Sequence, residues 1–398
     1  MTALRSTQKR LLTIMGTVTV AALVLFVAMG YAGYKALRGY EGATKVDAQL
    51  VELASTTVGM LATVDERNAL TTVTVFVLTP ESEGRVGGSI VSVPVSCDTT
   101  FGLGETRLPL TEVYDTGGAD DLALAVESLL SVTLDVSEVA NAPAASAILA
   151  PIGAVSADLP NDVTTTIDGE IEVLRPRGPA ELTVGEVVDV LSAHVDGEPE
   201  MNRRSNVESV WSAVADAAGS GVGQVAADGP VDTMAQLFSR LIAGPVASRG
   251  LGTSTIDPAL NAEGDDVVMI DRVDAVLVFA SIAPNSTSAP APGLVYRIEA
   301  PPGYDDRVKY AVSMILFYGQ NVQSVYVSPT VPASDATVFE IYDPRFKERT
   351  DDASTVFGTV SYDEPTTKIA GVDVVLRLGT GFLSGSISSV PSTTASGT

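Results

Sequence analysis

Residues 73–78 (VTVFVL) and residues 88–95 (GSIVSVPV) decide the fold of this chain. Both segments are rich in β-branched side chains, which favour strands. Residues 80–84 (PESEG) lie between them and contain the Pro and Gly that favour turns. Two apolar runs bounded by turn residues predict two neighbouring strands. We therefore expect the first folded domain to be built on a sheet.

Helical segments follow and alternate with further strands. Residues 120–130 (DDLALAVESLL) place four apolar side chains on one face, with two aspartates at the amino end. Thr183 and Glu186 have the spacing of a capping box and predict a helix over residues 186–194. Further helices are expected at 206–218 and 232–242, and strand-like runs at 267–270 and 275–279. This mixture predicts the α/β class.

The last part of the chain has a more regular pattern. Strand, helix, strand, strand, helix and strand are expected at residues 294–299, 305–318, 322–328, 337–342, 345–357 and 372–378. This order predicts a small ferredoxin-like α+β domain of the split βαβ type. Residues 284–293 are rich in Ser, Ala and Pro and predict a linker before it. Residues 384–398, rich in Ser, Thr and Gly, predict a disordered tail.

Residues 11–34 contain no charged side chain. A helix of this length reaches roughly 36 Å at ~1.5 Å per residue, which exceeds the ~30 Å hydrocarbon core of a bilayer. We expect an uncleaved, single membrane-spanning helix, because a signal peptide has a shorter apolar core. Residues 1–10 are then a cytoplasmic tail and residues 35–65 a membrane-proximal helical stem. The basic residues before the span favour this orientation, which places the bulk of the chain outside the cell membrane.

The net charge and the scarcity of Cys and His exclude several functions. The chain carries 49 acidic and 24 basic residues, and such a surface repels nucleic acid. One cysteine, Cys97, permits no intramolecular disulfide, and with one histidine, His194, no Cys/His zinc site is possible. Small apolar packing is the expected role of Cys97. A surface or structural role is expected for His194, and a core position for the only tryptophan, Trp211.

Several landmarks occur in a fixed order along residues 70–382. Residues 92–96 read SVPVS, residues 111–118 read TEVYDTGG before a helix, residues 185–186 and 202–204 read GE and NRR, and residues 371–379 read GVDVVLRLG. In this order they resemble the LytR-CpsA-Psr (LCP) family of cell-envelope proteins with an appended LytR C-terminal domain. The resemblance implies an LCP-like α/β domain over residues 66–283 and a LytR C-terminal-like domain over residues 294–383.

The family's activity, as the resemblance implies it, is transfer of a glycopolymer from a polyprenyl-pyrophosphate carrier to peptidoglycan. This reaction needs arginines that neutralise the pyrophosphate, an acid/base carboxylate, often a divalent metal, and an apolar slot for the lipid. The expected arginines and carboxylates are replaced in this chain, at Val95, Ser96, Thr71 or Thr72, Ala193 and Val195. The catalytic motifs are therefore degenerate.

Four residues remain as candidates for a rearranged anion site. Asp98 lies just after the altered motif, and Arg107 lies between that motif and Tyr114. Arg203 and Arg204 occupy the place of the family's later arginine-rich helix. The alternative for Asp98 is a turn aspartate, and the alternative for the arginines is a solvent-exposed loop.

Three hypotheses follow from these observations. In the leading one the chain is a degenerate LCP transferase, a pseudoenzyme that binds or scaffolds lipid-linked glycopolymer or envelope proteins without a metal or other cofactor. In the second it remains an active LCP-type phosphotransferase, with Mg²⁺ as a possible cofactor and the four candidates gathered in one pocket. In the third it is a purely structural surface protein.

Overall fold

The computed structural model describes most of the chain after residue 55. The described residues are 31, 35, 56–80, 86–100, 106–219, 230–256, 261, 266–284, 286, 293–350, 353–363, 369 and 371–385. Apart from Tyr31, the predicted span at residues 11–34 lies outside this set, as does the predicted tail beyond residue 385. Within the described ranges, no helix is both long enough and apolar enough to cross a membrane.

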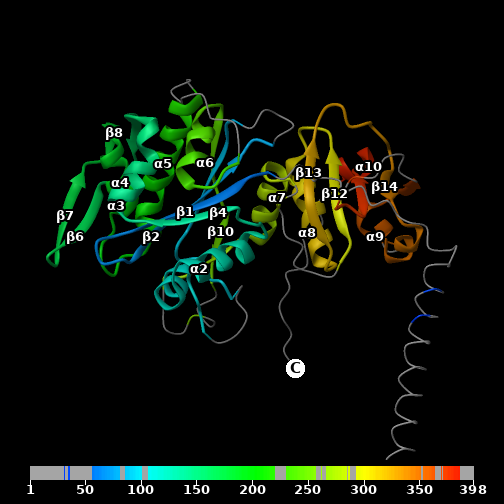
Figure 1. The fold of residues 1–398 in the computed structure, drawn as a ribbon. Helices are drawn as coiled ribbons and strands as arrows, with labels where there is room; N and C mark the ends of the chain where they lie inside the picture. The colour runs from blue at the N-terminus through cyan, green and yellow to red at the C-terminus, as the bar shows by residue number, and fades with distance from the viewer. Residues whose placement is uncertain are drawn as a thin grey trace, which may run out of the picture. The chain divides into compact units, whose positions relative to one another are not determined.

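A five-stranded sheet forms the centre of the first domain (Figure 1). Its strands lie in the order β4-β1-β2-β3-β9, with bounds β1 Val58–Val64, β2 Leu70–Leu78, β3 Gly88–Val93, β4 Val136–Ala140 and β9 Val246–Gly250. β2 pairs antiparallel with β1 and with β3. At the edges of the sheet, β4 pairs in parallel with β1, and β9 pairs in parallel with β3. The predicted strands at residues 73–78 and 88–95 are therefore present as β2 and β3.

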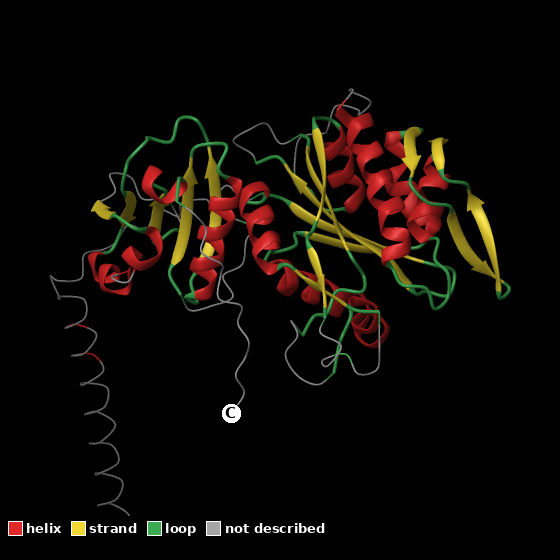
Figure 2. Ribbon diagram, turned by 180° about the vertical axis from the view of Figure 1, so that it is seen from behind, coloured by secondary structure: helices red, strands yellow, loops and turns green. Residues whose placement is uncertain are grey.

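Helices cover both faces of this sheet (Figure 2). One face packs against α3 Ala142–Leu149, α4 Val184–Ser192, α5 Met201–Gly219 and α6 Met234–Ile242. Phe76 of β2 lies at the centre of this layer, with its ring 5.5 Å from that of Trp211 and 5.6 Å from that of Phe238. The other face packs against α2 Leu110–Leu130 and α7 Arg272–Ile282. The domain is a three-layer α/β/α sandwich, so the predicted α/β class is confirmed, as is the core position of Trp211.

Local signals explain where the helices begin. Thr183 and Glu186 form the predicted capping box, in which each side chain accepts a hydrogen bond from the other residue's backbone N–H. α2 begins ten residues before the predicted helix and bends at Gly118, whose φ of 73° lies in the left-handed region that Gly adopts readily. α5 begins at Met201, five residues before the prediction, because the polar start of this helix carries no apolar periodicity.

Short strands complete the first domain outside the central sheet. The β5 Val155–Leu159 and β8 Gly178–Leu182 strands form one pair, and β10 Thr253–Thr255 and β11 Val268–Ile270 form another. A third pair, β6 Val163–Ile167 and β7 Glu170–Arg175, is a hairpin that extends beyond α4 at the left of Figure 1. A short 3₁₀ helix, η2 Ala150–Ile152, follows α3.

Two predictions for the first domain are wrong. Residues 58–64 are not part of a helical stem but form β1, and all seven residues of this strand are buried. A strand that is covered on both faces is continuously apolar, so its sequence lacks the alternation of apolar and polar residues that predicts a strand. Residues 275–279 are not a strand but lie in α7. The Asp271 carboxylate accepts hydrogen bonds from Val273 N and Asp274 N and so begins this helix.

The C-terminal domain contains the predicted strands and first helix, a 3₁₀ helix and a short helix in place of the predicted helix at 345–357, and an additional strand and short helix. Its elements are β12 Val295–Ala300, α8 Asp305–Phe317, β13 Asn321–Val327, β14 Thr337–Ile341, η4 Pro344–Thr350, α9 Ala353–Phe357, β15 Val360–Asp363, β16 Val374–Arg377 and α10 Thr380–Leu383. The sheet order is β13-β12-β16-β14-β15. The ferredoxin-like prediction is wrong, because β12 pairs directly and in parallel with β13, whereas a split βαβ unit holds another strand between these two. The order of elements along a sequence does not determine which strands pair.

The aromatic cluster around Phe76 provides a test of the first core. Phe76 is fully buried, whereas Leu124 on α2 is 61% exposed. We expect Phe76→Ala to lower the free energy of unfolding by about 3–5 kcal/mol because it leaves a cavity. Leu124→Ala is the control, with an expected change within about 0.5 kcal/mol. Urea unfolding of the full chain in detergent measures both changes, and equal effects would contradict this description of the core.

Candidate functional site

The turn after β3 is bound by one carboxylate. Val95 N and Ser96 N donate hydrogen bonds of 2.9 Å to the two carboxylate oxygens of Glu200, and the Ser96 hydroxyl lies 2.6 Å from Glu200 Oε2. Glu200 is the residue just before α5, and its own N–H donates to Asp266 Oδ2 at 2.7 Å. At the position of the altered motif, a carboxylate of the same chain therefore accepts the hydrogen bonds of the backbone N–H groups.

Asp98 and Arg107 form a separate, buried ion pair. Arg107 Nη1 lies 2.9 Å from Asp98 Oδ2, and the two residues are 4% and 0% exposed. Asp98 Oδ1 also accepts hydrogen bonds from the backbone N–H groups of Thr100 and Leu108. A buried charge of this kind needs a partner and further hydrogen bonds, and these are present. Asp98 therefore holds the loop after the motif together.

Arg203 binds backbone carbonyl groups of two neighbouring elements. Its Nη1 donates to Thr71 O at 2.7 Å and its Nη2 donates to Leu191 O, which links α5 to β2 and to the end of α4. Burial lowers the pKa of the Arg203 guanidinium to about 10, so the side chain stays charged at neutral pH. Its Nε is buried without a hydrogen-bond partner.

Arg204 is engaged by three different groups. Its Nε donates to Glu208 Oε1 at 2.9 Å, its Nη1 to Thr253 Oγ1 at 3.0 Å and its Nη2 to Leu251 O at 2.7 Å. The carboxylate neutralises its charge, and the other two contacts fix α5 against the segment that leads into β10. Both candidate arginines on α5 therefore use donors to hold the protein together.

The positions where the resemblance implies further ligands have neutral side chains. The hydroxyl of Thr63 lies 2.8 Å from that of Thr71 and 2.6 Å from that of Thr72, and all three residues are buried. Ala193 and Val195 are buried apolar residues. Among the described residues, no group of three or more His, Cys, Asp or Glu side chains could hold a metal ion.

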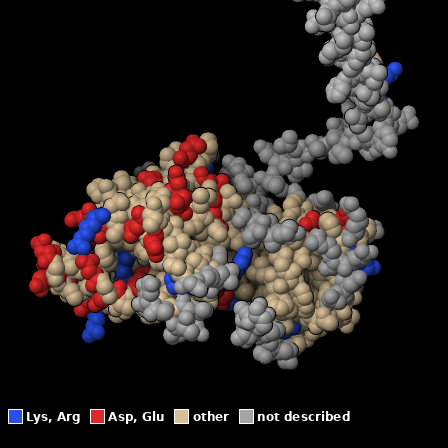
Figure 3. Space-filling view, turned by 90° about the horizontal axis from the view of Figure 1, so that it is seen from below, with Lys and Arg blue, Asp and Glu red and all other residues tan. Residues whose placement is uncertain are grey.

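Glu200 lines two cavities. The smaller, of about 10 Å³, is lined by Arg203, Arg204 and Pro94 and has room for at most one water molecule. The larger, of about 430 Å³, is lined by Arg107 together with the carboxylates of Glu112, Asp115, Glu200 and Asp266. Acidic groups thus outnumber basic ones around the larger cavity. Acidic side chains also form several patches on the face of the first domain seen in Figure 3.

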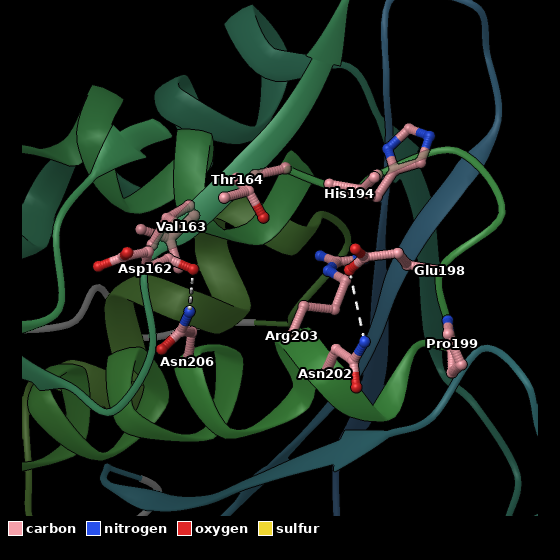
Figure 4. A pocket seen from close by; sticks show the side chains of 12 residues that line it. Asp162, Val163, Thr164, His194, Glu198, Pro199, Asn202, Arg203 and Asn206 are labelled. Carbon is pink, nitrogen blue, oxygen red and sulfur yellow. Dashed lines mark hydrogen bonds between the residues drawn. The ribbon is translucent and has the colours of Figure 1, made fainter. Parts of the chain in front are cut away.

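A third pocket lies between α5 and β6 (Figure 4). Asn202, Arg203 and Asn206 line it from α5, and Val163 and Thr164 line it from β6. Its volume is only about 40 Å³, and the Asn206 amide donates across it to Asp162 O at 3.5 Å. Arg203 therefore borders two small pockets.

The four predicted candidates do not gather in one pocket. Asp98 and Arg107 pair with each other, whereas Arg203 and Arg204 line the small cavity on α5. The sequence analysis did not predict the role of Glu200, which holds the turn. No motif or spacing in the sequence connects residue 200 with residues 95 and 96. Cys97 is fully buried, and burial raises the pKa of its thiol to about 12, in line with the expected packing role.

The Glu200 contacts predict a specific loss of stability. Glu200→Gln removes the charge and places an amide N–H₂ opposite a donor, so we expect a loss of about 1.5–3 kcal/mol. Glu198→Gln is a matched control, because Glu198 only accepts a 3.4 Å bond from Asn202. Urea unfolding of the two variants measures the difference. Equal stability of both variants and the parent chain would show that the carboxylate does not hold the turn.

Comparisons with known proteins give matches among solved structures alone. No family model matches the sequence, and no curated protein matches it. TagV of B. subtilis is 12% identical over 56% of this chain and 93% of its own, with a TM-score of 0.38. TagT of B. subtilis is 16% identical over 56% and 88%, with a TM-score of 0.38. A further structure of TagT, described as the LytR-CPS2A-psr family protein YwtF (TagT) with bound octaprenyl pyrophosphate lipid, is 16% identical over 56% of this chain and 86% of its own, with a TM-score of 0.34.

Proposed function

We propose that this chain is a membrane-anchored, extracytoplasmic LCP-like protein that acts in cell-envelope assembly by binding or scaffolding, without transferring glycopolymer. The observation that carries the proposal is the carboxylate of Glu200 on the backbone donors of Val95 and Ser96. In the family that the sequence resembles, this turn follows the strand that ends in the Arg- and Asp-containing motif. Here the same turn already holds a negative charge.

A pyrophosphate at this turn would meet unfavourable charge. It would have to displace Glu200 from three hydrogen bonds, and charge-assisted bonds contribute about 1.5–3 kcal/mol each. Glu112, Asp115 and Asp266 line the adjoining cavity and would repel it further. An arginine at position 95 would offset this repulsion, but the residue there is a buried valine.

The arginines on α5 support the same proposal. Transfer chemistry needs cations with donors directed at the phosphates. Arg203 donates to two carbonyl groups, and Arg204 donates to one carboxylate, one hydroxyl and one carbonyl group. The cavity beside them, at about 10 Å³, is far smaller than a diphosphate. Phosphate binding would require both side chains to give up contacts that join α5 to the rest of the domain.

The active transferase remains the second candidate, because Arg203, Arg204 and Glu200 do lie together beside Pro94. In that case a rearrangement of Glu200 would have to open the site, with Mg²⁺ as a possible cofactor. A purely structural surface protein is the third candidate. Like the proposed binding or scaffolding protein, it would not transfer glycopolymer. The core between the sheet and α5 is filled by Phe76, Trp211 and Phe238.

A transfer assay distinguishes the proposed function from the transferase. The full chain in detergent is given a radiolabelled glycan on polyprenyl pyrophosphate, peptidoglycan fragments and Mg²⁺. We expect no labelled peptidoglycan above the level of a protein-free control, because the turn and both arginines are already occupied.

The result that would overturn the proposal is transfer that the Arg203→Ala plus Arg204→Ala variant abolishes. Arg249→Ala is the matched control, because Arg249 lies exposed on β9 and lines none of the pockets described above. Unfolding curves for each variant establish that any lost transfer comes from the site and not from loss of the fold.

A further inference from the structure

The β6–β7 hairpin exposes large apolar side chains to solvent. Ile171 and Val173 of β7 are 59% and 57% exposed, and Ile167 at the end of β6 is 41% exposed. All residues of β7 from Glu170 to Leu174 are exposed. Most large apolar residues of the first domain are buried in its two cores, so this hairpin is an unusual concentration of uncovered apolar surface.

Only one edge of this hairpin is open. β6 and β7 form a two-stranded sheet with a two-residue turn at Asp168 and Gly169, both of which have positive φ. The outer side of β6 is held by the segment after α4, because Thr166 N donates to His194 O and Asp196 N donates to Thr166 Oγ1. In the part of the chain that the structure describes, β7 pairs with β6 alone.

The register identifies which backbone groups face the open edge. Ile167 pairs with Glu170 across the two-residue turn, and Thr166 pairs with Ile171. Backbone bonding alternates along an antiparallel pair, and the pair that closes a two-residue turn is hydrogen-bonded. The N–H and C=O groups of Ile171 and Val173 therefore point away from β6. These are the groups to which another strand would bond.

Natural edge strands usually carry features that block such pairing, among them Lys, Pro or a bulge. Neither outward-bonding residue of β7 is Lys or Pro, since both are β-branched and apolar, and the register shift of the hairpin lies beyond Val173, opposite Val163 and Thr164. A two-stranded hairpin is also only marginally stable by itself in water, so an added strand would stabilise it. The open edge thus fits strand addition by a partner.

The two faces of β7 define the chemistry of that partner. Ile171 and Val173 project to one face, whereas Glu170 and Glu172 project to the other, because side chains alternate along a strand. A second copy of this chain would bring Glu170 and Glu172 against identical charges, and the whole chain carries a net charge of −25. A fitting strand alternates apolar residues with Lys or Arg.

We propose that the outer edge of β7 is a docking site for an extended segment of another protein in which β-branched apolar residues alternate with basic residues. The segment adds a third strand through the backbone groups of Ile171 and Val173. Its apolar side chains cover these two residues, and its basic side chains pair with Glu170 and Glu172. The docking site lies on the hairpin and does not depend on whether the Glu200 region is catalytic.

A labelled peptide tests this proposal on the full chain in detergent. The probe is an eight-residue, end-blocked peptide of alternating Lys and Val with a fluorescent dye, and binding is followed by anisotropy. We expect saturable binding that weakens as salt rises, since salt screens exposed charge pairs. The peptide of alternating Glu and Val should bind at least about tenfold more weakly, as should a Lys-Val peptide with methylated backbone nitrogens.

Matched variants locate the binding on the edge. Ile171→Lys plus Val173→Lys places two cations on the outer strand and should weaken peptide binding at least about tenfold. Leu124→Lys is the control, because Leu124 is also exposed but lies on α2, away from the hairpin, and this variant should bind as the parent does. Amide hydrogen exchange should show protection of Ile171 and Val173 when the peptide is bound.

Three results would overturn the proposal. The first is no saturable binding of the Lys-Val peptide. The second is binding that the edge variant retains while its unfolding midpoint equals that of the parent. The third is self-association of the parent chain that the edge variant abolishes, which would assign the edge to a second copy.

Discussion

Burial of the central sheet on both faces is the constraint on which the rest of the first domain depends. Every residue of β1 and β2 is buried, so neither face can be left to water. Helices α3 to α6 cover one face and α2 and α7 cover the other. This packing brings the amino end of α5 beside the turn that leaves β3. The contact of Glu200 with Val95 and Ser96 follows from that arrangement, although Glu200 is more than a hundred positions from both residues in the sequence.

The chemistry of the turn is set by the sign of the charge that it holds. Backbone N–H groups at such a turn bind any anion, and a carboxylate from the same chain satisfies them at no cost in translational entropy. The same logic applies to the nearby cations, because Arg107, Arg203 and Arg204 each donate to protein oxygen atoms. An ion pair at Arg107, carbonyl groups at Arg203 and three different groups at Arg204 thus engage these cations within the domain. Four carboxylates and Arg107 line the cavity beside the turn.

Local signals in the sequence were sufficient for much of the fold. The capping box at Thr183 and the β-branched runs of β2 and β3 predict their elements because each depends on neighbouring residues. The strand β1 was missed because its apolar run, which is buried on both sides, lacks alternation. The helix α7 was mistaken for a strand because residues 275–279 are a short apolar run, which a strand and a buried helix can share. Strand pairing in the C-terminal domain and the role of Glu200 depend on contacts between distant segments. The sequence did identify Asp98, Arg107, Arg203 and Arg204, but the structure separates them into an ion pair and two helix-anchoring arginines.

The most direct test of the central claim is an NMR titration of the turn itself. The full chain, labelled with ¹⁵N at valine and serine, is titrated in detergent with a short-chain prenyl pyrophosphate, with and without Mg²⁺. If Glu200 holds the backbone donors, the amide resonances of Val95 and Ser96 stay unchanged up to millimolar ligand. Saturable shifts of these two resonances, absent when the prenyl alcohol replaces the pyrophosphate, would show that the turn still binds a diphosphate and would contradict the assignment of a non-catalytic site.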